Sequence, residues 1–268
     1  MPPDDEAIGT IVFDLDGVVY VGSQEIPGAG RTLAALDDLG WRLLFATNNS
    51  SRTADDVATK IADVAGYRPT TADVVTSGLA AAHHVKEGSK VFVVGEPGLV
   101  STFEGHGHVT TTDPDDADTV IVGVDFSITY RDISDAARAI RNGAEFVATN
   151  TDATFPTPSG LLPGAGAGVA AIATASGCEP IVCGKPHRPM GELILERIEG
   201  ESVWMVGDRP ETDIAFGKKF GWQTVLVSTG VTNTTSAIPD AYLPDHMVES
   251  IVDLAMLVSD GRRTAQTK

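Results

Sequence analysis

Two carboxylates stand two positions apart after an apolar run near the start of the chain. Asp14 and Asp16 follow residues 11–13, and Gly17 comes next. Side chains at i and i+2 of a strand lie on the same side, so both acids can face one site. An acid pair at a strand end indicates metal-assisted chemistry, with one carboxylate as nucleophile and the other as acid and base. A polar turn is the simpler interpretation, since Asp and Gly favour turns.

A hydroxyl and an amide follow a second apolar run, residues 42–46. Thr47 and Asn48 can donate side-chain and backbone hydrogen bonds to phosphate oxygens. A polar loop that leads into a capped helix would contain the same residue types. On its own, this pair favours the loop.

Two further strand ends carry charged residues. Lys185 lies between a glycine and a proline, which restrict the backbone and can place its ammonium against an anion. Asp208 follows residues 202–206, and Asp213 lies about one helical turn further along. The simpler interpretations are a surface lysine and an acid favoured by a helix dipole.

Together these residues offer a set of oxygen ligands and one cation. Such a set suits Mg²⁺, which binds one or two carboxylates, substrate phosphate and water. A phosphate charge about 4 Å from a carboxylate is repelled by about 4 kcal/mol at an effective dielectric of about 20. Mg²⁺ and Lys185 are the candidates for offsetting that repulsion, so the set predicts a reaction on a phosphate ester.

The chain of 268 residues is strongly acidic, with a formal net charge of −18. That charge argues against nucleic acid, whose binding rests on a basic surface, and against anionic membranes. The first residues are acidic where a signal peptide would be basic, and no apolar run approaches the length of a membrane span. We therefore expect a cytoplasmic protein. A salt-rich environment and simple solubility explain the acidity equally well.

Three other features have simple interpretations. Cys178 and Cys183 are expected as reduced thiols, with a disulfide as the alternative, and two ligands are too few for structural zinc. Segment 164–169 resembles a dinucleotide fingerprint, but its third glycine comes one place early and no strand precedes it. It predicts close packing at a helix start. The acidic run 113–118 predicts a solvated loop, with weak binding of a cation as the alternative.

Short apolar strands alternate with helical segments along the whole chain, which is typical of an α/β fold with a mostly parallel sheet. We expect a helix over 53–65, capped by its first residue, and a last helix near 247–258. The expected strands are 10–13, 42–46, 74–76, 90–94, 119–124, 145–148, 180–183, 202–206 and 223–227. In open α/β sheets ligands bind beyond the carboxyl ends of the strands, where these candidate side chains lie.

The candidate residues form two clusters on either side of a long segment with its own strands and helices. We therefore expect a catalytic core of residues 1–79 and 182–268, interrupted by an inserted domain of residues 80–181. Asn150 and Asp152 follow a strand of the insertion and are candidates for contact with a substrate. An Asx-rich turn is the simpler interpretation.

The order and spacing of the motifs resemble those of the haloacid dehalogenase superfamily along the whole chain. The motifs read Asp-x-Asp-Gly-x-x-Tyr, Thr-Asn-Asn-Ser, Gly-Lys-Pro and Gly-Asp-Arg-x-x-Thr-Asp. This set is similar to the nitrophenylphosphatase-like (NagD-like) branch. The resemblance implies a Rossmann-like core and an inserted α/β cap of the C2 type, which agrees with the expected insertion.

The resemblance also implies a role for each acid. Asp14 would attack phosphorus and form an aspartyl-phosphate, and Asp16 would protonate the leaving alcohol and then activate water. Mg²⁺ would be bound by the carboxylates of Asp14 and Asp208 and by the backbone carbonyl of Asp16. Asp213 would support the metal site from close by.

The remaining implications concern phosphate and the class of reaction. The residues that would bind the transferring phosphoryl group are Thr47, Asn48 and Lys185. Residues 16–26 would form a mobile flap. The acid at position 16 disfavours a dehalogenase, because dehalogenases lack it, and phosphomutases usually have a smaller helical cap after the first motif.

The sequence therefore predicts a Mg²⁺-dependent phosphatase acting on a small phosphorylated metabolite: a sugar phosphate, glycerol phosphate, phosphoglycolate or nucleoside monophosphate. We expect a monomer or homodimer. The alternatives are a phosphotransferase or mutase with the same aspartyl-phosphate, and a catalytically silent phospholigand-binding protein. A nicotinamide-dependent oxidoreductase is the least favoured.

Overall fold

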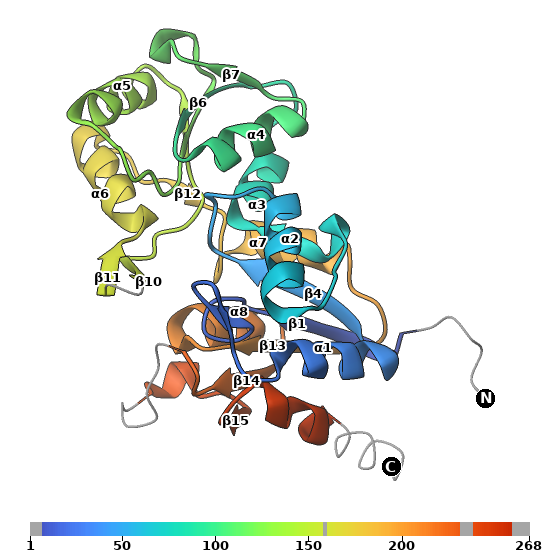
Figure 1. The fold of residues 1–268 in the computed structure, drawn as a ribbon. Helices are drawn as coiled ribbons and strands as arrows, with labels where there is room; N and C mark the ends of the chain where they lie inside the picture. Colours follow the sequence, from blue (N-terminus) through green and yellow to red (C-terminus); the bar gives the residue numbers. More distant parts are fainter. Residues whose placement is uncertain (1–6, 158–159, 231–237, 259–268) are drawn as a thin grey trace. The chain divides into compact units, whose positions relative to one another are not determined.

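The computed structural model describes residues 7–157, 160–230 and 238–258, and the chain forms two compact units (Figure 1). Unit 1 comprises residues 1–46, 58–74 and 195–268. Unit 2 comprises residues 47–57 and 75–194. The chain passes between the units at four elements, which are the end of β4, α2 (Ala54–Ala65), β5 and α7 (Arg188–Leu195). Among the described residues, no helix is both long enough and apolar enough to cross a membrane.

Unit 1 is built on a six-stranded sheet in the order β15-β14-β13-β1-β4-β5, and the pairs from β15 to β4 are parallel. Its strands are β1 (Gly9–Phe13), β4 (Arg42–Thr47), β5 (Val74–Thr76), β13 (Ser202–Gly207), β14 (Gln223–Val227) and β15 (His246–Val248). The central strands are apolar on both faces because helices cover both sides of a parallel sheet.

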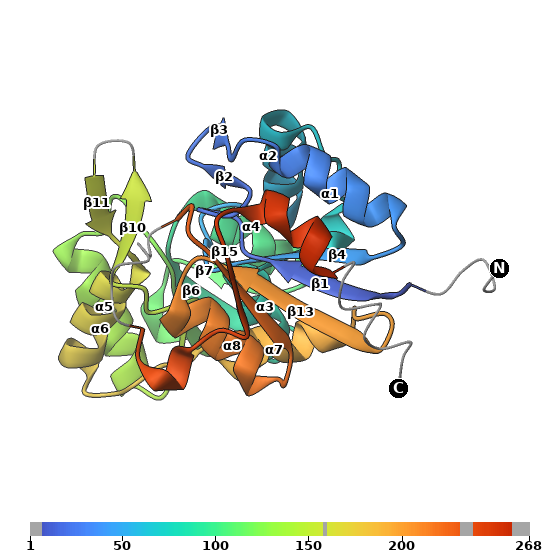
Figure 2. The same ribbon diagram turned by 90° about the horizontal axis from the view of Figure 1, so that it is seen from below.

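Helices lie on both sides of the sheet of unit 1. Figure 2 shows α1 (Ala29–Asp38) and α8 (Ala215–Lys219) on opposite sides of it. Phe13 and Phe45 are fully buried and stack with their ring centroids 5.9 Å apart. The ends of the neighbouring strands β1 and β4 are therefore held by packing just before their polar residues begin.

Unit 2 has a five-stranded parallel sheet in the order β12-β9-β8-β6-β7. Its strands are β6 (Lys90–Val94), β7 (Val109–Thr111), β8 (Thr119–Val122), β9 (Glu145–Ala148) and β12 (Ile181–Val182). Its helices besides α7 are α3 (Ser77–His84), α4 (Pro97–Gly105), α5 (Tyr130–Arg141) and α6 (Ala165–Ser176). An antiparallel hairpin joins β10 (Thr154–Thr157) to β11 (Gly160–Pro163).

One hydrophobic core of unit 2 lies between this sheet and the helices α5 and α6, which pack side by side (Figure 1). Helix α5 begins at a capping box, in which Thr129 and the carboxylate of Asp132 bond to each other's backbone N–H groups. Its buried face presents small side chains to the sheet, including Ala136 and Ala139. This packing fixes β8 and β9, and with them the loop that follows β9.

The structure confirms the predicted α/β class and most of the predicted elements. Helix α2 begins directly after Thr53, whose hydroxyl accepts the backbone N–H of Asp56 at 3.1 Å. Helix α6 begins at the glycine-rich segment, where a Cβ on Gly166 would come 2.5 Å from the carbonyl oxygen of Thr151. The expectation that no strand precedes this segment was wrong, because β11 ends directly before it. Both cysteines are free thiols, as expected, with Cys178 exposed and Cys183 buried.

The last predicted helix begins later than expected. His246–Val248 forms the edge strand β15 beside β14, and helical backbone begins only near residue 251. The imidazole of His246 stacks on the ring of Trp204, with centroids 5.4 Å apart. Pairing with β14 thus overrides the local helical pattern.

The acidic run 113–118 is a solvated loop, as predicted, with its four aspartates exposed, and it contains one short turn. Pro114–Asp116 forms a 3-10 turn, and the side chain of Asp113 accepts the N–H of Asp115 at 3.0 Å. Lys90 pairs with Asp116 at 2.7 Å, and Arg138 pairs with Asp115 at 2.9 Å. Two cationic side chains from neighbouring elements therefore compensate the run.

Candidate active site

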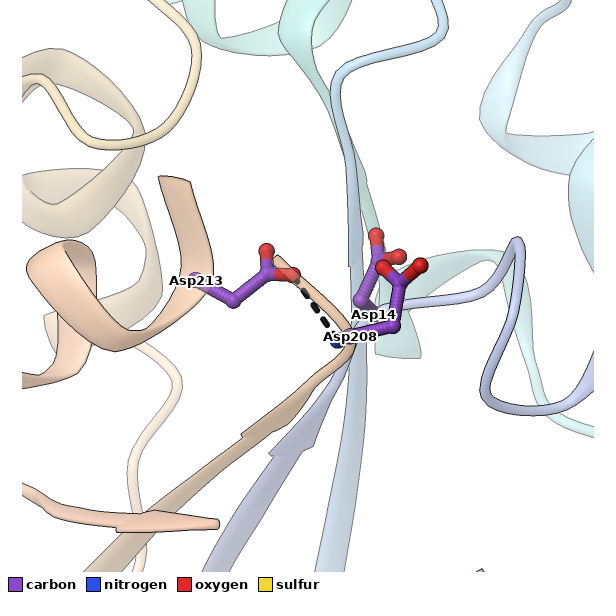
Figure 3. A group of neighbouring side chains, drawn as sticks. All are labelled: Asp14, Asp208 and Asp213. Carbon is purple, nitrogen blue, oxygen red and sulfur yellow. Dashed lines mark hydrogen bonds between the residues drawn. The ribbon is translucent and has the colours of Figure 1, made fainter. Parts of the chain in front are cut away.

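An acidic cluster lies at the carboxyl ends of two neighbouring strands in unit 1. Strands β1 and β13 are parallel, with Phe13 opposite Val206, and the N–H of Asp14 donates to the Val206 carbonyl at 2.8 Å. Asp14 and Asp208 therefore leave the sheet at the same edge. One carboxylate oxygen each from Asp14, Asp208 and Asp213 lies within 4.8 Å of the others (Figure 3).

Asp213 reaches the cluster because the chain turns back directly after β13. Residues Pro210–Ile214 form a π-helical turn, and the Asp213 carboxylate accepts the backbone N–H groups of Asp208 at 3.2 Å and Arg209 at 3.1 Å. A Cβ on Gly207 would overlap the Asp213 side chain. The glycine before Asp208 is thus required by the close approach of the third acid, which the sequence alone did not explain.

The cluster fits a hard divalent cation by the chemistry of its donors. Mg²⁺ and Ca²⁺ prefer carboxylate and carbonyl oxygens. Two carboxylates within 4.8 Å of each other repel each other by at least about 3.5 kcal/mol at an effective dielectric of about 20. The attraction of a bound divalent cation to both carboxylates would outweigh that repulsion.

Asp16 lies in a tight turn between the acidic cluster and a short hairpin. The N–H of Gly17 donates to the Tyr20 carbonyl at 2.8 Å, and the turn leads into β2 (Tyr20–Val21) and β3 (Gln24–Glu25). Gly17 has φ +89°, and a Cβ there would come 2.6 Å from Oδ2 of Asp208. Only a glycine suits both conditions. The ammonium of Lys60 lies 3.7 Å from the centre of the Tyr20 ring, which anchors the hairpin to α2.

A third strand end, which the sequence analysis missed, closes this turn. Thr229 follows β14, and its hydroxyl donates to the Gly17 carbonyl at 2.6 Å. A Cβ on the next residue, Gly230, would overlap the carboxylate of Asp208. The available signal was Ser228-Thr229-Gly230, a hydroxyl and glycine run directly after an apolar strand, like the runs at the other motifs.

A second polar cluster lies in unit 2. Its side chains hydrogen-bond around Asn48, which bonds to Lys185 and to the carboxylate of Asp152, while the amide of Asn150 donates to the Asn48 carbonyl at 2.7 Å. Thr47 is the last residue of β4, and its hydroxyl accepts the N–H of Asn49 at 3.1 Å. Lys185 is buried, with 3% of its surface exposed.

The structure thus gathers the predicted side chains into two groups. Asp14, Asp208 and Asp213 lie together in unit 1, with Asp16 in the adjoining turn. Thr47, Asn48, Lys185, Asn150 and Asp152 lie in unit 2. The roles assigned to them remain predictions, as do the domain boundaries at residues 79 and 182 and the mobility of the flap.

Cys183 lies two residues before Lys185 but is no candidate nucleophile. Burial, with a smaller contribution from the charge of Glu145, raises the pKa of its thiol to about 12. A thiol with that pKa is protonated at neutral pH, and the thiolate is the reactive form.

Two family models match the chain. The model of the haloacid dehalogenase-like hydrolases matches residues 11–109, and a second model of HAD-like hydrolases matches residues 182–254. The matches contain all four motifs and leave most of the inserted segment unmatched.

Known proteins resemble the chain over nearly its whole length. It is 38% identical to the 5'-nucleotidase YutF of Bacillus subtilis over 248 residues, which cover 90% of this chain and 95% of the relative. The solved p-nitrophenyl phosphatase of Archaeoglobus fulgidus has a TM-score of 0.87 and 30% identity, covering 94% of this chain and 99% of that one. The glycerol phosphate phosphatase of Mycobacterium tuberculosis, solved with magnesium, has a TM-score of 0.84 and 35% identity. The match covers 91% of this chain and 75% of that one.

Proposed function

The chain belongs to the haloacid dehalogenase-like hydrolases, and from that membership we propose that it is a Mg²⁺-dependent phosphatase of small phosphomonoesters that works through an aspartyl-phosphate. The observation that carries the proposal is the cluster of Asp14, Asp208 and Asp213 at the carboxyl edge of the unit 1 sheet. The names of the relatives support the class of reaction, because they are phosphatases and a nucleotidase.

The metal is proposed to bind the carboxylates of Asp14 and Asp208 and the backbone carbonyl of Asp16. Asp213 supports them through its hydrogen bonds to the backbone that carries Asp208. When bound there, Mg²⁺ would offset the negative charge of the phosphate and of the acids around it.

The chemistry then belongs to the two acids of the first motif. An oxygen of the Asp14 carboxylate attacks phosphorus, the bond to the ester oxygen breaks, and Asp16 gives its proton to the leaving oxygen. Asp16 next takes a proton from water, whose oxygen attacks the phosphorus of the aspartyl-phosphate. Inorganic phosphate leaves and the Asp14 carboxylate is restored.

The phosphoryl group is proposed to be bound by Thr47, Asn48 and Lys185. Residues 80–181 are proposed to act as the cap that selects the substrate. Within it, Asn150 and Asp152 are the residues proposed to contact the substrate. Nucleoside monophosphates and glycerol phosphate are the first substrates to test, because relatives are named for nucleotides and for glycerol phosphate. Sugar phosphates and phosphoglycolate complete the set of substrates to test.

A cytoplasmic location is also part of the proposal.

The direct test is the release of phosphate from p-nitrophenyl phosphate with Mg²⁺, with EDTA, and by the variant Asp14→Asn. We expect turnover with Mg²⁺ and none in the other two cases. Asp63→Asn, at an exposed position of α2, is the matched control and keeps full activity. Full activity of Asp14→Asn would reject the nucleophile.

The same assay separates the alternatives. A sugar acceptor that outcompetes water for the phosphoryl group would favour a phosphotransferase or mutase. Tight binding of phosphoesters without turnover, over a broad panel, would favour a silent binding protein.

A further inference from the structure

The side chain of Asn48 forms two hydrogen bonds with the backbone of Lys185, one as acceptor and one as donor. Its Oδ1 accepts the Lys185 N–H at 2.8 Å, and its Nδ2 donates to the Lys185 carbonyl at 3.1 Å. The two residues are 137 positions apart in the chain. A carboxamide that satisfies both backbone groups of one residue fixes the position of that residue's main chain.

The second N–H of this carboxamide is also used. Nδ2 lies 3.2 Å from Oδ1 and 3.1 Å from Oδ2 of Asp152. An asparagine side chain has two N–H donors, so the Lys185 carbonyl and the Asp152 carboxylate use both of them. The Asn48 side chain has no N–H left for a phosphate oxygen.

The carboxylate of Asp152 also sets the orientation of the amide. A carboxylate only accepts hydrogen bonds, so it selects the rotamer of Asn48 that points Nδ2 toward it. The flipped amide would place Oδ1 against the carboxylate and a donor against the Lys185 N–H, and both contacts would become repulsive.

The surrounding backbone leaves Asn48 little freedom. A Cβ on Gly184 would come 2.6 Å from Oδ1 of Asn48, so the residue before Lys185 has to be a glycine. The Asn48 carbonyl accepts from the hydroxyl of Ser77 at 2.6 Å and from the amide of Asn150 at 2.7 Å. The N–H of Asp152 donates to Oδ1 of Asn150 at 3.0 Å, which holds the carboxylate in place.

We infer that Asn48 is a positioning residue that acts through Lys185, with Asp152 fixing the orientation of its amide. The inference deepens the proposed function and rests on it, because it assumes that Lys185 meets the phosphoryl group. It replaces the role that the resemblance implies for the Asn48 side chain, which is not a phosphate ligand, and it adds to the expected role of Asp152 the orientation of Asn48.

A double-mutant cycle between Asn48→Ala and Lys185→Met tests the inference through kcat/KM for p-nitrophenyl phosphate. A displacement of about 1 Å in a catalytic group costs about 100-fold. We therefore expect Asn48→Ala alone to lower kcat/KM roughly 30- to 100-fold. The loss is expected to divide between kcat and KM in the same proportion as the loss in Lys185→Met. In the Lys185→Met background the same change is expected to lose less than about threefold, since the group it positions is gone. Losses that multiply would show that Asn48 binds phosphate itself, and would overturn the inference.

Matched variants control for a merely structural effect. Asn49→Ala changes the neighbouring asparagine, which is exposed and bonds only to Ser51 among its described side-chain contacts, and it is expected to stay within about threefold of wild type. Asp152→Ala is expected to lose about tenfold, while Asp152→Asn keeps most activity because its amide oxygen still accepts from Nδ2. Asn48→Ser serves as the second variant should Asn48→Ala fail to fold.

Hydrogen exchange at the backbone N–H of Lys185 separates this inference from the proposed function. Asn48→Ala is expected to speed that exchange at least tenfold, and Asn49→Ala to leave it unchanged. Unchanged exchange in Asn48→Ala would overturn the inference even in an active phosphatase. Faster exchange in a protein that turns over no phosphoester would refute the proposed function and leave the link between Asn48 and Lys185 standing.

Discussion

The hydroxyl of Thr229 donates a hydrogen bond of 2.6 Å to the backbone carbonyl of Gly17, a residue 212 positions earlier in the chain. The bond joins the end of β14 to the turn that follows the first acid pair. The N–H of Gly17 is held at the same time by the Tyr20 carbonyl at 2.8 Å. Both backbone groups of Gly17 are therefore fixed, and with them the peptide that carries Asp16.

Removing the Thr229 hydroxyl is expected to loosen this turn. A hydrogen bond of this kind contributes about 1 kcal/mol, so we expect Thr229→Val to lower kcat/KM roughly five- to tenfold. Thr229→Ser keeps the hydroxyl and is expected to stay within about twofold of wild type. Equal losses in the two variants would show that the methyl group, and not the hydrogen bond, matters.

Gly230 is expected to tolerate no side chain. A Cβ there would overlap the Asp208 carboxylate, which is itself buried and cannot move aside. We expect Gly230→Ala to lose at least about 100-fold in activity, because a shift of about 1 Å in a group of the active site, here the proposed metal ligand Asp208, has that cost. Gly105→Ala is the matched control, since nothing lies within 4 Å of a Cβ at that glycine. Normal activity in Gly230→Ala would contradict the contact.

Mg²⁺ is expected to stabilise the fold through the acidic cluster. At a free concentration about 100 times its Kd, a ligand that binds only the folded state adds about 2.7 kcal/mol, or roughly 5–10 °C in Tm for a chain of this size. Differential scanning calorimetry with MgCl₂ and with EDTA measures this shift. Asp208→Asn is expected to abolish the shift and Asp63→Asn to retain it. A Tm that is insensitive to Mg²⁺ in the wild type would exclude a metal site of useful affinity.

Asp245 is expected to make the stability of unit 1 depend on pH at the acidic end. Partial burial raises the pKa of Asp245, but two hydrogen bonds from Thr224, together with the charges of Lys218 and His246, outweigh it, so the pKa lies below its ordinary value. The folded state then binds fewer protons than the unfolded state. The resulting stabilisation is present above the unfolded pKa of about 3.9 and is lost as the pH falls through the lower folded pKa.

Urea unfolding of wild type and Asp245→Asn at several pH values measures this effect. Because the side chain is exposed, we expect a difference of only a few tenths of a kcal/mol near neutral pH. The difference is expected to shrink as the pH falls below about 4 and to vanish below the folded pKa. A difference that grows on acidification would show that the sign of the pKa shift is wrong.

Local pattern was enough to find the sheet and the acids at its edge. Apolar runs predicted β1 and β13, and since parallel neighbours end at one edge, Asp14 and Asp208 were expected to meet. Gly17, after the first acid pair, was assigned to a turn. Its second function, close approach to the Asp208 carboxylate, depends on which loop lies opposite and cannot be derived from neighbouring residues.

What the sequence by itself determined was which side chains stand at strand ends, because strand formation and the alternation of side chains are set by residues a few positions apart. The tertiary structure decided what those side chains bond to. The amide of Asn48 looked like a phosphate ligand, yet Lys185 and Asp152, more than 100 residues away, take its hydrogen bonds. Thr229 had no visible role until β14 brought it to Gly17. A hydrogen bond acts only at about 3 Å, so the fold selects its partner from all residues that come within reach.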